Sequence, residues 1–178
     1  HGTSRRQRQM CIRDSGVPLR LETDVTASAI GEHRHGAGRG VGRLVYLTVG
    51  TGVGGGLLID GLPTTGHLHP EMGHLLLPRQ PDDGFAGVCP FHGDCLEGMV
   101  SGPALAARAG IPGEQLTADH PVWSLAGRIL ADGLTTIQAV LAPDRVILGG
   151  GVGSNPALRA PLLAALGERL SGYWPTIQ

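Results

Sequence analysis

The residues best suited to chemistry lie in one stretch of the chain, where thiols and imidazoles are closely spaced. Cys89, His92 and Cys95 follow one another at intervals of three, and His74 precedes them. Two thiolates and two imidazoles form the ligand set of a tetrahedral zinc site, and four protein ligands leave no position for an activated water. The spacing favours a structural zinc over a redox pair, a catalytic cysteine or a chance cluster, because redox cysteines usually follow the tighter C-x-x-C pattern.

Carboxylates flank this cluster and also occur earlier in the chain. Glu71 and Glu97 lie on either side of the expected zinc ligands. Ionised carboxylates are strong hydrogen-bond acceptors, so the pair suits a polyhydroxylated ligand, although solvated surface charges would give the same pattern. Asp24, preceded by Thr23, begins an apolar segment. Local sequence alone favours a helix cap there over a buried general base.

A glycine-rich stretch follows a β-rich run. Gly50, Gly52 and Gly55 match the pattern G-x-G-x-x-G, which marks a dinucleotide site only when a helix opens directly after the loop. Here a short apolar run and a turn follow instead. We therefore expect a loop between two strands that offers backbone N–H groups and the Thr51 hydroxyl to a phosphate. An ordinary glycine-rich hairpin is the alternative.

A second glycine run lies near the end of the chain and consists of Gly149, Gly150 and Gly151. It follows a buried-type strand and precedes a helix, where the chain must turn tightly and a flat ligand can approach the backbone. A simple left-handed turn would explain these glycines equally well. The two runs together favour a nucleotide.

Composition excludes several classes of function. The formal net charge is −1 and aromatic residues make up 3% of the chain, which argues against a nucleic-acid-binding surface. No apolar run approaches the ~20 residues of a membrane span, and the start lacks the apolar middle of a signal peptide. Three cysteines cannot build a disulfide framework. We expect a soluble, cytoplasmic protein without nucleic-acid or membrane partners.

The first fifteen residues differ from the rest of the chain. Residues 1–15 include Cys11 and four arginines and show neither helical nor strand periodicity. We expect them to be a non-native or disordered lead and exclude them from fold reasoning. The remaining domain is expected to span residues 16–178.

Apolar periodicity predicts alternating strands and helices, and hence an α/β fold. Strands are expected around Leu19 and Leu21 and over residues 44–49, 57–59 and 146–148, with a glycine loop at 50–56. Helices are expected over residues 25–32 and 103–109, from Asp119 and Pro121 to Leu141, and from Asn155 onward. The last helix is expected to face inward with Leu158, Leu162, Leu163, Leu166 and Leu170.

Several motifs together resemble the ROK family of sugar kinases and repressors. They are the segments Leu21 to Glu32, Thr48 to Gly56, His69 to His74, Val88 to Gly98 and Ile147 to Gly151. The resemblance extends from about Gly16 to the last residue. Two of these motifs are most similar to those of the bacterial fructokinases of that family. Their sequences are His-Pro-Glu-Met-Gly-His and Cys-Pro-Phe-His-Gly-Asp-Cys-Leu-Glu-Gly.

The resemblance implies an actin-like ATPase (ribonuclease H-like) fold. Of this fold, the chain would contain mainly the C-terminal domain, with a loop that a structural zinc holds together. It also implies ATP, Mg²⁺, a structural Zn²⁺ and transfer of the γ-phosphoryl group to a hexose. The similarity to fructokinases implies that this hexose is D-fructose, which is converted to fructose 6-phosphate. Asp24 would be the general base. The other implied contacts are Thr23, Glu71, His74 and Glu97 with the sugar, Gly50, Thr51 and Gly52 with the phosphates, and Gly149, Gly150 and Gly151 with adenosine.

One departure from the family pattern concerns the N-terminal phosphate-loop domain, whose Asp-Gly-Gly-Thr type motif has no match here. We therefore expect a fragment with little or no kinase activity of its own, belonging to a protein that forms a homodimer when full length. Phosphorylation of mannose or glucose is an alternative. A sugar-responsive repressor of the same family and a zinc-stapled interaction module without a ligand are further alternatives.

Overall fold

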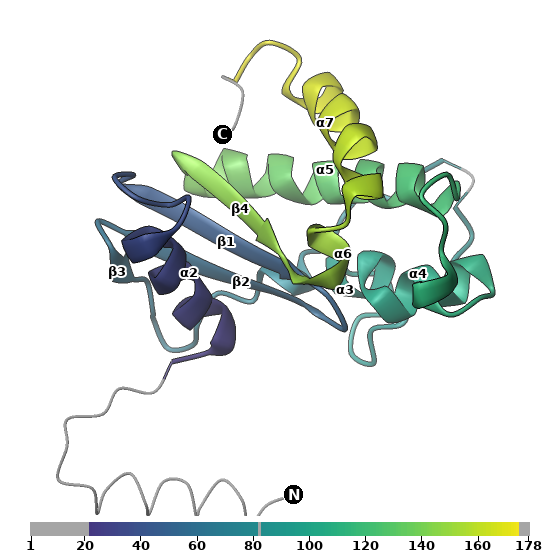
Figure 1. Ribbon diagram of the computed structural model, residues 1–178, viewed down its shortest axis with the longest axis horizontal. Coiled ribbons are helices and arrows are strands. Elements are labelled where there is room, and N and C mark those ends of the chain that lie inside the picture. Colours follow the sequence, from purple (N-terminus) through teal and green to yellow (C-terminus); the bar gives the residue numbers. More distant parts are fainter. Residues whose placement is uncertain (1–21, 82, 175–178) are drawn as a thin grey trace, which may run out of the picture.

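The computed structural model describes residues 22–81 and 83–174 (Figure 1). The strand expected around Leu19 and Leu21 and the lead at residues 1–15 lie outside this described part. The elements, in chain order, are α2 (Asp24–His35), β1 (Arg43–Val49), β2 (Val53–Ile59), β3 (Leu62–Pro63), the 3₁₀ turn η1 (Met72–His74), α3 (Leu96–Val100), α4 (Gly102–Ala109), the 3₁₀ turn η2 (Gly113–Gln115), α5 (Val122–Leu141), β4 (Arg145–Gly149), α6 (Gly150–Gly153) and α7 (Pro156–Leu170).

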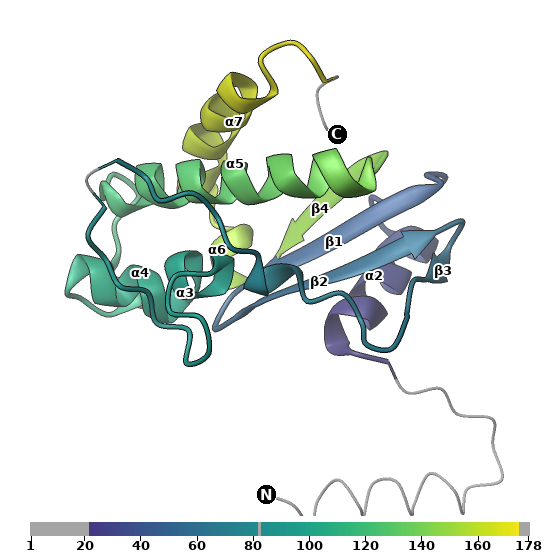
Figure 2. The same cartoon turned by 180° about the vertical axis from the view of Figure 1, so that it is seen from behind.

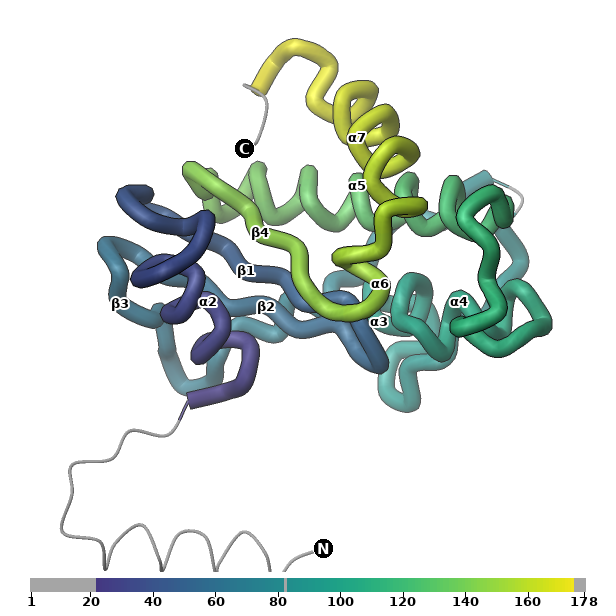
Figure 3. Tube along the Cα trace, viewed as in Figure 1, coloured from purple at the N-terminus to yellow at the C-terminus, as the bar shows by residue number. Residues whose placement is uncertain are grey.

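A four-stranded mixed sheet in the order β3-β2-β1-β4 forms the centre of the molecule. β1 pairs antiparallel with β2 through the short turn between them, and parallel with β4, which follows about a hundred residues later. The tube trace in Figure 3 shows β4 and α6 lying beside β1 and the loop that follows it. The carboxyl ends of the two parallel strands therefore lie at the same edge of the sheet.

Helices cover both faces of this sheet, as the expected α/β class requires (Figure 2). Val45 and Leu47 of β1 belong to the main core with α5 and α7, whereas Leu44 faces a smaller core with α2. Successive strand residues point to opposite faces, so this alternation follows from strand geometry. No helix among the described residues has the length and apolar character needed to cross a membrane.

The loop expected at residues 50–56 is shorter than predicted, because β2 already begins at Val53 and contains three glycines. A Cβ on Gly56 would lie 2.9 Å from the Val25 carbonyl oxygen of α2, and one on Gly55 would overlap the Met72 side chain of η1. These glycines therefore allow α2 and η1 to approach the strand closely from its two faces. The sequence predicted a loop at these positions because glycine is uncommon in strand interiors.

The expected helices at residues 103–109, in the segment that ends at Leu141, and after Asn155 are confirmed. Asn155 caps α7 by accepting a hydrogen bond from the Ala157 N–H at 3.0 Å. Leu163 was wrongly expected to face inward, since it is 53% exposed. The short helix α3 was not expected, and Gly150 and Gly151, expected only as a tight turn, begin the single-turn helix α6.

Candidate functional site

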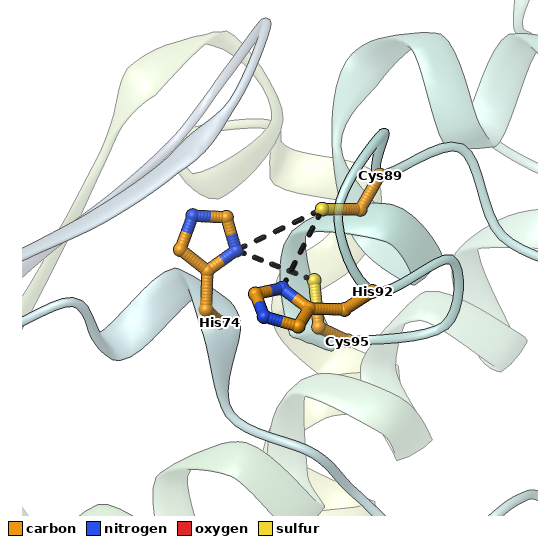
Figure 4. A group of neighbouring side chains, drawn as sticks. All are labelled: His74, Cys89, His92 and Cys95. Atoms are coloured by element: carbon orange, nitrogen blue, oxygen red, sulfur yellow. Dashed lines mark hydrogen bonds between the residues drawn. The ribbon is translucent and has the colours of Figure 1, made fainter.

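The structure brings His74, Cys89, His92 and Cys95 together, with the four donor atoms within 4.8 Å of one another (Figure 4). His74 Nδ1 lies 3.8 Å from Cys89 Sγ and 3.6 Å from Cys95 Sγ, and His92 Nδ1 lies 3.8 Å from Cys89 Sγ. Ligands of a tetrahedral zinc with bond lengths of ~2.0–2.3 Å are separated by roughly 3.3–3.8 Å. The three nitrogen–sulfur separations therefore match an ion of this size and coordination.

Three local structures hold these ligands. His74 ends η1, and Gly73 allows that turn to pack against the Val53 carbonyl. A tight turn carries His92, because Cys89 and Gly93 exchange backbone hydrogen bonds of 2.9 and 3.2 Å. Cys95 is the N-cap residue, immediately before α3. Both cysteines are buried and His92 is exposed, so the cluster closes a surface loop over the core.

The two thiols are electrostatically unequal. Burial raises the pKa of Cys89, but hydrogen bonds from the backbone of His92 and Phe91 outweigh it and lower the pKa of this thiol to about 7. Burial raises the pKa of Cys95. Both are free thiols. A thiol that ionises readily is a good metal ligand, because the thiolate is the form that coordinates.

A second group of expected site residues lines a pocket of about 340 Å³ at the edge of the sheet where β1 ends. Asp24 reaches it from α2, and Thr51 and Gly52 form its loop. Glu97 reaches it from α3, with Oε2 accepting a hydrogen bond from the Val53 N–H at 3.0 Å. A carboxylate from each of two helices therefore lies beside the glycine loop.

Thr23 rather than Asp24 caps α2. Thr23 Oγ1 accepts a hydrogen bond from the Thr26 N–H at 3.1 Å and lies 2.8 Å from Thr26 Oγ1. Asp24 is the first residue of the helix and is exposed, so its carboxylate is not buried as the alternative to a cap required. The cap occupies the Thr23 hydroxyl and leaves the Asp24 carboxylate at the pocket.

Glu71 does not join Asp24 and Glu97. Its carboxylate is half exposed and lies 2.9 Å from His69 Nε2. It lines a different, largely apolar pocket of about 260 Å³ between η1 and the end of α5. Glu71 lies three residues before the ligand His74, but its side chain pairs with His69 and lines the apolar pocket rather than the pocket at the glycine loop.

The two glycine runs meet at the carboxyl ends of the parallel strands. Thr48 of β1 is paired with Gly149 of β4, and a Cβ on Gly50 would lie 3.9 Å from the Gly151 backbone nitrogen. Gly150 has φ of +81°, and a Cβ there would overlap the Val49 carbonyl oxygen. Ligands of α/β sheets bind outside the carboxyl ends of the strands, which is where these two runs lie.

Sequence reasoning missed two features of this site. Thr48 lines the pocket, a position that its place two residues before Gly50 could have indicated. The Gly102 N–H at the start of α4 donates a 2.6 Å hydrogen bond to the Gly50 carbonyl oxygen. No local pattern marks that contact, because it joins backbone groups far apart in the chain.

Comparison with known proteins identifies the family of this chain. The model of the ROK family matches residues 11–177. The chain is 46% identical over 158 residues to a fructokinase of Lactococcus lactis subsp. cremoris, covering 88% of this chain and 53% of that protein. It is 41% identical over 165 residues to a fructokinase of Zymomonas mobilis, covering 89% and 54%. The chain thus spans about half the length of these relatives.

Solved structures show the same fold. A ROK hexokinase from Thermus thermophilus superposes with a TM-score of 0.76 at 31% identity, over 96% of this chain and 63% of that one. A ROK family glucokinase from Streptomyces griseus, in complex with glucose and AMPPNP, gives 0.74 at 28% identity, over 93% and 64%. The fold is therefore the mixed α/β, actin-like ATPase fold of these kinases. The chain belongs to the ROK family.

Proposed function

We propose that this chain provides sugar- and nucleotide-binding parts of an ATP-dependent hexose kinase that converts D-fructose to fructose 6-phosphate. The observation that carries the proposal is the pocket in which the Asp24 and Glu97 carboxylates lie beside the loop of Thr51 and Gly52. The fructokinases among the relatives support fructose as the substrate.

In the proposed reaction, Asp24 accepts the proton of the attacking sugar hydroxyl. That oxygen forms a bond to the γ-phosphorus of ATP while the bond from this phosphorus to the β-phosphate oxygen breaks, releasing ADP. Phosphoryl transfer depends mainly on positioning and charge stabilisation, so a single placed carboxylate suffices as the base. Backbone N–H groups at Thr51 and Gly52 would face the phosphates, and Gly149, Gly150 and Gly151 would contact adenosine. Mg²⁺, when bound with ATP, neutralises phosphate charge.

Zinc would have a structural role here. His74, Cys89, His92 and Cys95 would hold it, and four protein ligands leave no position for a reacting water. His74 presents Nδ1 to both thiols, so Nε2 is the ring nitrogen left for the sugar. Glu97, two residues after a ligand, would be fixed with it, whereas Glu71 lines a different pocket and has no part in the proposed sugar site.

The test uses the full-length protein encoded by the reading frame that contains this chain, with the 178-residue chain assayed beside it. Coupled ADP release is measured with fructose, mannose and glucose. Asp24→Asn should lower kcat by about 10²–10⁴-fold with sugar affinity nearly unchanged, and the exposed control Asp60→Asn should leave kcat as it is. Sugar binding without ATP turnover would overturn the kinase proposal in favour of a sugar-responsive repressor. Sedimentation of the full-length protein tests the homodimer.

A further inference from the structure

The segment that follows the last metal ligand contacts the glycine loop at two points. Glu97, two residues after Cys95, accepts a hydrogen bond from the Val53 N–H at 3.0 Å. The Gly102 N–H donates to the Gly50 carbonyl oxygen at 2.6 Å. Both ends of the loop at residues 50–53 are therefore held by residues 97–102.

These two contacts belong to one rigid unit. Ser101 is buried, ends α3 and caps α4, where its hydroxyl accepts a hydrogen bond from the Ala104 N–H at 3.4 Å. The side chains of Leu96 and Val100 are buried in the main core. A shift at Cys95 would therefore move α3 as a whole, since packed elements move as units rather than deforming continuously.

The loop itself has little freedom of its own. The Gly50 N–H donates to the Gly52 carbonyl oxygen at 2.8 Å, which closes a tight turn. A Cβ on Gly52 would lie 2.8 Å from Glu97 Oε2, so the carboxylate packs directly against the backbone of the turn. The position of the turn is set by what its two ends contact.

We propose that Glu97 is a positioning residue that couples the metal cluster to the phosphate-facing loop, so that loss of the metal loosens residues 50–53. This inference deepens the proposed function, because the same loop would face the ATP phosphates. Its new content is that Glu97 acts on the loop backbone and not only on a sugar. The coupling runs from the ligand Cys95 through α3 to Glu97, whose carboxylate contacts the Val53 N–H directly.

Amide hydrogen exchange of the 178-residue chain, followed by NMR without sugar or nucleotide, tests this coupling. Glu97→Ala should speed exchange at Val53 by about tenfold or more, because a hydrogen bond to a charged acceptor is lost. Glu97→Gln keeps an acceptor oxygen and should stay within about threefold of the unaltered chain. Zinc chelation should speed exchange at Val53 as well, and chelation of the Glu97→Ala variant should add little.

A matched control is available on α2, where Glu32 Oε2 accepts a hydrogen bond from the Ala37 N–H at 2.9 Å. Glu32→Ala should speed exchange at Ala37 and leave Val53 unchanged. Unchanged exchange at Val53 in Glu97→Ala would overturn the proposal, as would equal acceleration of the buried Leu47 amide, which indicates global unfolding. Because no substrate is present, a failure here is distinct from a failure to phosphorylate fructose.

Discussion

A buried ion pair between Arg108 and Asp83 joins α4 to the segment between η1 and α3, which carries Cys89 and His92. Removing this pair tests how strongly that segment is held. Arg108 of α4 donates from Nη1 and Nη2 to the two Asp83 carboxylate oxygens at 2.8 and 2.9 Å, and both side chains are only 7% exposed. The guanidinium also lies 4.2 Å from the centroid of the Phe85 ring. Removing one partner of such a pair leaves an uncompensated buried charge.

Arg108→Ala should therefore lower the free energy of unfolding by about 3–5 kcal/mol at pH 7. Urea unfolding followed by fluorescence of the buried Trp123 measures this change. The double variant Arg108→Met/Asp83→Ala should recover part of the loss, because no buried charge then remains. Glu168→Gln, which alters an exposed ion pair with a 3.9 Å separation, should cost less than about 1 kcal/mol.

The pH dependence has a definite sign. The hydrogen bond from Arg108 outweighs burial and lowers the pKa of Asp83 below its usual value. A lowered pKa in the folded state gives stability that is present above the unfolded pKa of ~3.9 and is lost as the pH falls through the folded pKa. The cost of Asp83→Asn should thus be constant from pH 7 to about 5 and shrink in more acidic solution. A loss below about 1 kcal/mol in Arg108→Ala at pH 7 would refute the reasoning.

Two further predictions concern the site. Metal analysis should find one zinc per chain, with Cys95→Ala substoichiometric and less stable to heat because the metal contributes to folding; wild-type zinc content in this variant would remove the assignment. Gly150→Ala should cost about 1–3 kcal/mol in urea unfolding because its backbone has φ of +81°. Gly151→Ala, where a Cβ meets no atom within 4 Å, should be nearly neutral, and equal costs for the two variants would contradict the assigned strain.

Periodicity was enough to predict the larger elements. The long apolar pattern of α5 and the capping residue Asn155 identify two helices because both signals are local. The five-residue helix α3 has no such signal, since packing of Leu96 and Val100 in the core stabilises it more than its own length can. The start of β2 was missed because glycines serve there as space for neighbouring elements.

The candidate site was likewise predictable from the sequence only in part. Ligand type and spacing were enough to predict which four side chains meet at the metal cluster. They could not show that Glu71 turns toward His69, because a single backbone turn decides that direction. Nor could they show the hydrogen bond between Gly102 and Gly50, which depends on long-range packing.

The parallel pairing of β1 and β4 has a consequence for how the protein folds. The Arg43 N–H at the start of β1 donates a 2.7 Å hydrogen bond to Asp144, 101 positions later, whereas Val49 pairs with Val53 across a short turn. Closing the longer loop costs about 3 kcal/mol more in chain entropy. The β1–β2 hairpin can therefore form early, while the two glycine runs come together late in folding and only after β4 has been synthesised.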